Sequence, residues 1–276
     1  MIEIGKTNNL RIVKTVDFGL YLDGYEAGEI LLPTRYLPKK FEIDEYIDVF
    51  IYKDSEDRLI ATTEMPFVKV GEFALLKVKA IDRMGAFMDW GLMKDLLVPF
   101  SEQQVRMEQG KKYIVRVYVD ETTQRIVASA RIEKFLDTSP HDYTENQEVE
   151  ILIANQTELG YKVIINNSHT GVIYANEIFS HIDRGQRLKA FIKQIRADQK
   201  IDVCLNKPGY EKIDHLADKI LAELRLNAGF LPLNDKSSSE SIYAAFGESK
   251  KTFKKSIGAL YKKKKILIGE DGIRLI

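Results

Sequence analysis

Residues 18–23 (FGLYLD) decide the fold, because their pattern returns along the chain. Shifted by 66 positions, the segment falls on residues 84–89 (MGAFMD), and residues 30–33 (ILLP) then fall on residues 96–99 (LLVP) without a gap. Shifted by 141 positions, Gly19 falls on Gly160. A constant offset across separate segments indicates internal repetition. The sequence therefore predicts three copies of one unit, each of about 65–75 residues.

Each unit has the pattern of short β-strands. In the second unit, residues 74–81 alternate between two faces, as Leu75, Lys77 and Lys79 do against Leu76 and Val78. The predicted strands of this unit are residues 74–81, 85–89, 96–98, 112–119 and 126–130. Five short strands separated by turns indicate a small closed antiparallel barrel, which leaves no exposed sheet edge. Because such a core is small, we expect neighbouring barrels to pack together.

The pattern changes after residues 207–209 (KPG), where Pro-Gly breaks regular structure. Apolar residues then recur at helical spacing over residues 211–227. A capping box of Ser237 and Glu240 predicts a second helix that ends at Phe246, and Ser249 can cap a third. A hairpin follows, with strands at residues 266–268 and 273–276. Three helices followed by a hairpin predict a winged helix, a variant of helix-turn-helix.

The expected fold is therefore mainly β with a C-terminal α+β domain. Barrels are predicted at residues 1–65, 66–135 and 142–207, and the winged helix at residues 210–276.

Composition limits the classes of function. The 276 residues include one cysteine, Cys204, which excludes a disulfide framework and is expected to be a buried core thiol. The four histidines lack metal-ligand spacing, and no phosphate-binding glycine loop or nucleophile motif occurs. We therefore expect no enzyme, no cofactor and no metal. No apolar run approaches the ~20 residues of a membrane span, so a cytoplasmic location with no membrane partner is expected.

Charge is distributed unevenly although 41 basic and 41 acidic residues cancel. Residues 1–65 carry a net charge of −5 and residues 136–209 of −2, whereas residues 66–135 carry +3 and residues 210–276 carry +4. A polyanion should therefore bind through the second and fourth segments. The acidic first unit is expected to serve for packing or for contact with another protein, and the ribosome is one candidate partner.

Aromatic and basic side chains favour binding of a single-stranded nucleic acid. Phe87 follows Gly85 by two residues, and Tyr21 holds the same place in the first unit. Bases stack on exposed rings, and barrels of this shape bind single strands across their second and third strands. Both rings could instead fill cores, and Trp90 in the following loop could either pack or stack.

The segment 248–265 holds eight lysines and one acid. On the third predicted helix, Lys250, Lys251, Lys254 and Lys255 lie away from its apolar positions. Lysine is a sequence-independent partner of phosphate, although such a run can also be an ordinary solvated face. Residues 249–265 contain no Arg, Asn or Gln, so direct readout of duplex DNA would be poor.

Residues 85–89 (GAFMD), 96–99 (LLVP) and 115–120 (VRVYVD) resemble the S-one (S1) RNA-binding domain, a five-stranded OB-type barrel. That family carries one aromatic before the glycine and another two residues after it, followed by a strand with a histidine. Phe18 and Tyr21 match both aromatics. The departures are Met84 in the second unit, Leu159 and Lys162 in the third, and Pro33, Pro99 and Tyr174 at the histidine position.

The whole chain is similar to the conserved virulence factor B family of bacteria, on residues 54–63 (DSEDRLIATT), 229–238 (GFLPLNDKSS) and 253–261 (FKKSIGALY). This resemblance implies a cytoplasmic RNA-binding regulator of gene expression. The candidate RNA-binding residues are Phe18, Tyr21, Lys77, Lys79, Arg83, Phe87, Trp90, Tyr161, Lys162, Tyr174, Lys193, Arg196, Lys250, Lys251, Lys254, Lys255, Lys262 and Lys263.

The leading hypothesis is a non-enzymatic protein that binds single-stranded RNA and regulates expression after transcription. The alternatives are a transcription regulator that binds DNA through the winged helix, and a platform for proteins of the translation or transcription machinery.

Overall fold

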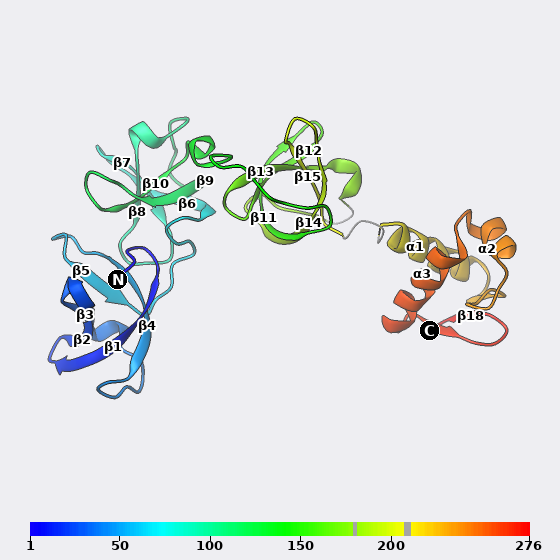
Figure 1. Ribbon diagram of the computed structural model, residues 1–276, viewed down its shortest axis with the longest axis horizontal. Helices are drawn as coiled ribbons and strands as arrows, with labels where there is room; N and C mark the ends of the chain where they lie inside the picture. Colours follow the sequence, from blue (N-terminus) through cyan, green and yellow to red (C-terminus); the bar gives the residue numbers. More distant parts are fainter. Residues whose placement is uncertain (179–180, 207–210) are drawn as a thin grey trace. The chain divides into compact units, whose positions relative to one another are not determined.

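Five-stranded barrels built on one pattern make up most of the chain (Figure 1). The computed structural model describes residues 1–178, 181–206 and 211–276, and the predicted break at residues 207–209 lies outside them. The first barrel is closed, in the order β1-β2-β3-β5-β4. Its strands are β1 (Thr7–Val16), β2 (Gly19–Asp23), β3 (Glu29–Pro33), β4 (Tyr46–Lys53) and β5 (Leu59–Thr62). It is not wholly antiparallel, because β3 and β5 pair in parallel at Leu31 and Ile60.

The other two barrels repeat this design. The second is a nearly closed sheet of order β10-β9-β6-β7-β8, and the third is a closed barrel of order β11-β12-β13-β15-β14. The second has β6 (Phe73–Ile81), β7 (Gly85–Asp89), β8 (Leu96–Pro99), β9 (Lys112–Val119) and β10 (Ile126–Ser129). The third has β11 (Glu148–Thr157), β12 (Gly160–Ile165), β13 (His169–Tyr174), β14 (Arg187–Ile195) and β15 (Ile201–Cys204). The predicted strands of the second unit are confirmed to within one residue at each end.

Irregular features recur at the offsets of 66 and 141 residues, which confirms the internal repetition. The first strand of every barrel carries a register shift, between Ile12 and Lys14 in β1 and at the matching positions of β6 and β11. A short 3-10 helix follows the third strand each time, at Thr34–Tyr36, Phe100–Glu102 and Ala175–Glu177. Because a bulge increases local twist, its repetition helps each sheet to curl.

The repeated glycine has a packing reason. A Cβ atom on Gly19, Gly85 or Gly160 would lie 2.0–2.2 Å from a carbonyl oxygen of the neighbouring strand. Only glycine permits this close approach of two backbones, which is why it opens the second strand of every barrel.

Neighbouring barrels share buried side chains, as the sequence predicts. Phe50 and Tyr52 of the first barrel lie in one apolar cluster with the core of the second, where the rings of Phe50 and Trp90 are 5.7 Å apart. Phe73 of the second barrel is buried in a cluster with Leu152 and other residues of the third. Cys204 is buried, as expected.

The C-terminal residues form the predicted winged helix. The elements are α1 (Glu211–Leu226), β16 (Phe230–Leu231), α2 (Ser239–Phe246), α3 (Lys250–Lys262), β17 (Ile266–Ile268) and β18 (Ile273–Leu275). Leu224, Phe253 and Ile257 are buried in its core. Ser249 caps α3, as predicted. The capping box at Ser237 is wrong, because Ser238 accepts the capping hydrogen bond from the amide of Ser241.

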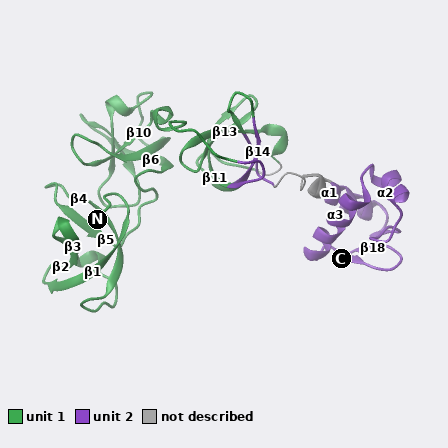
Figure 2. Cartoon of the chain, viewed as in Figure 1, with its two compact units in different colours: residues 1–143, 149–189, 196–201 green, residues 144–148, 190–195, 202–276 purple. Residues whose placement is uncertain are grey.

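Two compact units divide the described residues (Figure 2). One comprises residues 1–143, 149–189 and 196–201, and the other comprises residues 144–148, 190–195 and 202–276 with the winged helix. Among the residues that the structure describes, no helix has the length and apolar composition of a membrane span.

Candidate nucleic-acid interface

Phe87 lies on the outer face of the second barrel. It pairs in register with Ala80 of β6 and Leu97 of β8. Because side chains alternate along a strand, Ala86 and Met88 point into the core while the Phe87 ring stays half-buried at the surface. The ring is therefore placed where a base could reach it.

Basic side chains lie on the strand and the turn next to Phe87. Lys77 and Lys79 are exposed on β6, and Arg83 is exposed in the turn before β7. The Lys79 Nζ atom is 2.9 Å from Asp95 Oδ1, and this hydrogen bond raises the pKa of Lys79. Within the described part of the chain neither Lys77 nor Arg83 forms an ion pair, although Lys77 lies in register opposite the exposed Asp89.

The first barrel presents its two aromatics differently. Phe18 is 56% exposed and meets Tyr21 edge to face, with ring centroids 6.3 Å apart. Lys14 lies 4.9 Å above the Tyr21 ring and forms an ion pair with Glu29. The Tyr21 ring thus already has a cationic partner in an acidic barrel, which makes it a poorer stacking platform than Phe87.

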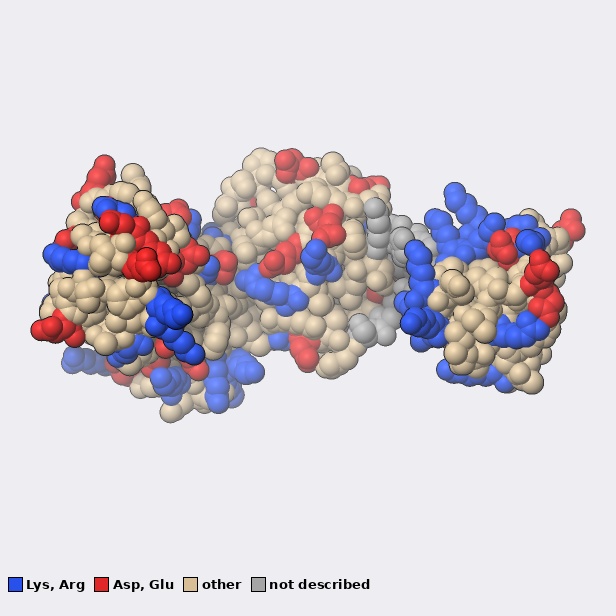
Figure 3. Space-filling view, turned by 90° about the horizontal axis from the view of Figure 1, so that it is seen from below, with Lys and Arg blue, Asp and Glu red and all other residues tan. Residues whose placement is uncertain are grey.

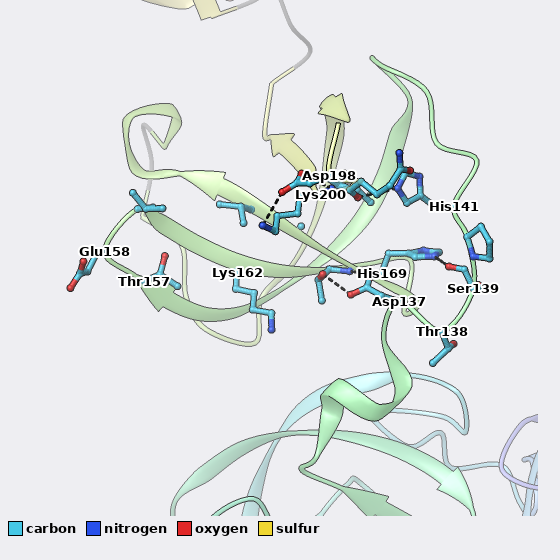
Figure 4. A pocket seen from close by; sticks show the side chains of 17 residues that line it. Asp137, Thr138, Ser139, His141, Thr157, Glu158, Lys162, His169, Asp198 and Lys200 are labelled. Carbon is cyan, nitrogen blue, oxygen red and sulfur yellow. Dashed lines mark hydrogen bonds and ion pairs between the residues drawn. The ribbon is translucent and has the colours of Figure 1, made fainter. Parts of the chain in front are cut away.

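The third barrel carries a large groove in the corresponding place (Figure 4). Its volume is about 1090 Å³, and Lys162 lines it at the position that Tyr21 and Phe87 hold in the other barrels. Lys200, also on the groove, forms an ion pair of 2.9 Å with Asp198. The groove is lined by β12, β13, the start of β15 and residues 137–141.

The segment before the third barrel forms one wall of this groove. Asp137 accepts hydrogen bonds from the amide and the hydroxyl of Thr170, at 2.9 and 2.7 Å. His169 donates through Nε2 to the carbonyl of Ser139 at 3.0 Å, because a carbonyl can only accept. Its Nδ1 then accepts from the hydroxyl of Tyr143. Sequence reasoning missed this wall, since it tested the histidines only for metal spacing.

Other candidates of the third barrel are half-buried. Arg196 donates a short hydrogen bond to the Tyr174 hydroxyl and lies 5.8 Å from its ring centroid, so these two predicted residues do meet. Tyr161 is half-buried on β12, and Lys193 is half-buried on β14.

Trp90 does not belong to the surface. It is 3% exposed in the core shared by the first two barrels, and its indole nitrogen donates to the Lys94 carbonyl. The packing alternative therefore holds for Trp90, and its ring is not an exposed surface on which a base could stack. A burial this deep is set by contacts between barrels, which local sequence does not reveal.

The winged helix presents its lysines outward (Figure 3). Lys251, Lys254 and Lys255 are exposed on α3, and Lys250 is half-buried, while Phe253, Ile257 and Leu260 are buried. Lys262 and Lys263 at the end of α3 are also exposed. The predicted division of α3 into an apolar and a cationic face is confirmed. Among the described residues, no group of His, Cys, Asp and Glu could hold a metal ion.

Comparisons with known proteins agree with this architecture. Residues 4–64 match the family model described as S1 domain, and residues 218–275 match the CvfB-like winged helix domain. Uncharacterized protein YitL of Bacillus subtilis is 28% identical, over 95% of this chain and 90% of its own length. Conserved virulence factor B of Staphylococcus saprophyticus is 26% identical, over 99% and 94% of the two chains.

A solved structure, described as a multidomain protein with nucleic acid binding domains from Streptococcus pneumoniae, is 24% identical. It covers 99% of this chain and 98% of its own, with a TM-score of 0.41. The fold and the family matches define the class of protein: S1-type OB barrels in tandem with a winged helix, domain types that bind nucleic acid. The chain belongs to the conserved virulence factor B family.

Proposed function

We propose that the chain is a non-enzymatic protein that binds single-stranded RNA in the cytoplasm and regulates gene expression after transcription. The observation that carries this proposal is the half-buried ring of Phe87 on the surface of the second barrel, with Lys77 exposed on the neighbouring strand and Arg83 in the preceding turn. A ring that stacks on a base, next to cations that neutralise phosphates, is the arrangement by which OB barrels hold an unpaired strand.

The lysine face of α3 supplies a second contact. Lys251 and Lys255 project to solvent there, and lysine binds phosphate without regard to base sequence. Occupancy of a transcript by these surfaces would change its folding, its translation or its exposure to nucleases. The acidic first barrel is proposed to contact a protein, for which the ribosome is one candidate.

Titration of the full chain with a labelled RNA oligonucleotide tests the proposal. Replacing Phe87→Ala should weaken binding by about tenfold, because one base stack contributes about 1–3 kcal/mol. Phe67→Ala is the matched control, since Phe67 is 68% exposed in the loop before the second barrel and lies off the Phe87 strand. Equal affinities of the two variants would remove the second barrel from the proposal.

Duplex DNA of equal length separates the RNA proposal from DNA binding by the winged helix. We expect weaker binding to the duplex, because residues 249–265 hold none of the Arg, Asn or Gln side chains that read base edges well. A decisive preference for the duplex would favour a transcription regulator. If neither nucleic acid binds, the protein-platform alternative is favoured.

A further inference from the structure

A half-open hollow lined by Phe87 lies where the first and second barrels meet. Its volume is about 160 Å³, and both barrels line it. The lining residues are Tyr52, Lys53, Met84, Phe87, Trp90, Lys94, Asp95, Leu96, Leu97, Arg125, Ile126 and Val127.

Most of the side chains that line the hollow are aliphatic or aromatic. Phe87 of β7 and Leu97 of β8 are cross-strand neighbours on one face of the sheet, and Val127 of β10 is buried. Tyr52 of the first barrel also lines the hollow, as does Trp90, whose ring packs against Phe50. A flat ring in the hollow would make favourable apolar contacts with these side chains.

Two cations of the second barrel are fixed by oxygen atoms of the first. The Lys94 ammonium donates to the carbonyls of Lys53 and Asp54, at 2.8 and 2.9 Å. The Arg125 guanidinium donates through Nε and Nη2 to the carboxylate of Asp57, at 2.7 and 2.8 Å. An ammonium has three N–H donors and a guanidinium has five, so each keeps donors in reserve. Both side chains line the hollow and are held in place before a ligand arrives.

Size and polarity together select the ligand. A protein cavity of about 150 Å³ accepts one benzene ring, so the hollow matches a single six-membered ring and not the larger bicyclic ring of a purine. Fixed N–H donors at an apolar site call for a ring that carries acceptor oxygens. Pyrimidine bases have this size and these oxygens.

We propose that the hollow between the first two barrels takes one pyrimidine base of a bound single strand, stacked against Phe87. This inference rests on the proposed function, since the base enters as part of an RNA chain. It gives the acidic first barrel a direct part in recognition, because that barrel supplies one wall and holds Lys94 and Arg125 in position.

The test compares affinities of the full chain for oligouridylate and oligoadenylate of equal length. The wild type should bind oligouridylate about tenfold more tightly than oligoadenylate, because one stacked base contributes about 1–3 kcal/mol to binding. Leu97→Trp fills the hollow and should bring the ratio of the two affinities close to one. Leu31→Trp is the matched control, because Leu31 pairs with Tyr21 in the first barrel as Leu97 pairs with Phe87.

If a melting curve shows that Leu97→Trp does not fold, Leu97→Ala decides the question. It enlarges the hollow enough to admit a purine. The preference for oligouridylate should therefore decrease, because oligoadenylate binds more tightly to this variant than to the wild type. A wild type without a base preference, or a preference that both Leu97 variants keep, would overturn the pyrimidine site and leave RNA binding intact. Failure of the wild type to bind either oligonucleotide would overturn the proposed function itself.

Discussion

The lysine face of α3 allows a sharp electrostatic prediction, because its cations differ in the partners they already have. Lys250 is half-buried, with its ammonium 3.5 Å from the Lys236 carbonyl, and Lys254 lies 4.0 Å from an Asp235 oxygen. Lys251 and Lys255 are exposed, and no ion pair is recorded for them within the described residues. The double variants Lys251→Gln/Lys255→Gln and Lys250→Gln/Lys254→Gln therefore remove equal charge from unequal environments.

The expected magnitude follows from counterion release. Each phosphate that a lysine neutralises on a single strand steepens the plot of log affinity against log salt by about 0.7. Loss of Lys251 and Lys255 should therefore flatten the slope by about 1.4, so that between 50 and 200 mM salt the wild type loses about sevenfold more affinity than the variant. The Lys250/Lys254 pair should flatten it less, because those cations already contact oxygens of the protein.

Fluorescence anisotropy of labelled RNA, titrated at several salt concentrations, measures both slopes. Melting curves of the two variants control for folding, and we expect them to match the wild type since all four side chains lie off the apolar face. If the Lys251/Lys255 variant keeps the wild-type slope, the helix face is only solvated and the winged helix takes no part in binding phosphate.

Three further predictions concern stability. Trp90→Ala should cost about 3–5 kcal/mol in denaturant unfolding, since a buried ring leaves a cavity; a cost near zero would contradict its core position. Gly160→Ala should cost more than about 1 kcal/mol by the same assay, because its Cβ would meet the Ile173 carbonyl at 2.0 Å; full stability would refute that close approach. The hydrogen bond from Arg125 lowers the pKa of Asp57, so this contact stabilises the fold above the ordinary aspartate pKa of about 3.9, and the stabilisation is lost as pH falls through the lowered value. The difference in Tm between the wild type and Asp57→Asn should therefore be present at neutral pH and disappear in acid. A difference that does not depend on pH would argue against the ion pair.

Much of the fold could be predicted because the chain repeats. The strand at residues 85–89 is bounded by a glycine and an acid, and its counterpart 66 residues earlier has the same limits, so two weak signals reinforce each other. The helix cap near Ser237 was placed one residue too early. Three successive serines offer the same hydroxyl, and only the backbone conformation at Ser238 selects among them.

The candidate site was less predictable, since it depends on contacts between repeats. The sequence left Phe87 and Trp90 open between surface and core. In the structure the alternation along β7 exposes one face of Phe87, whereas Trp90 follows the strand in a loop where no periodicity gives a direction. Its burial against Phe50 required knowledge of how two barrels pack. The fixing of Lys94 by the carbonyls of residues 53 and 54 likewise joins segments about 40 positions apart, with no local signal in either.

The shared apolar clusters tie the folding of each barrel to that of its neighbour. The second barrel, expressed alone, would expose the apolar surface that packs against Phe50 of the first barrel and the one that packs against Leu152 of the third. The small core of so short a chain leaves little free energy of folding to offset this exposure. Stability along such an array depends on adjacent modules, as it does in repeat proteins. Truncation at the domain boundaries would thus lower folding cooperativity and so obscure any direct effect on RNA binding. Point substitutions are the better way to assign a contribution to each domain.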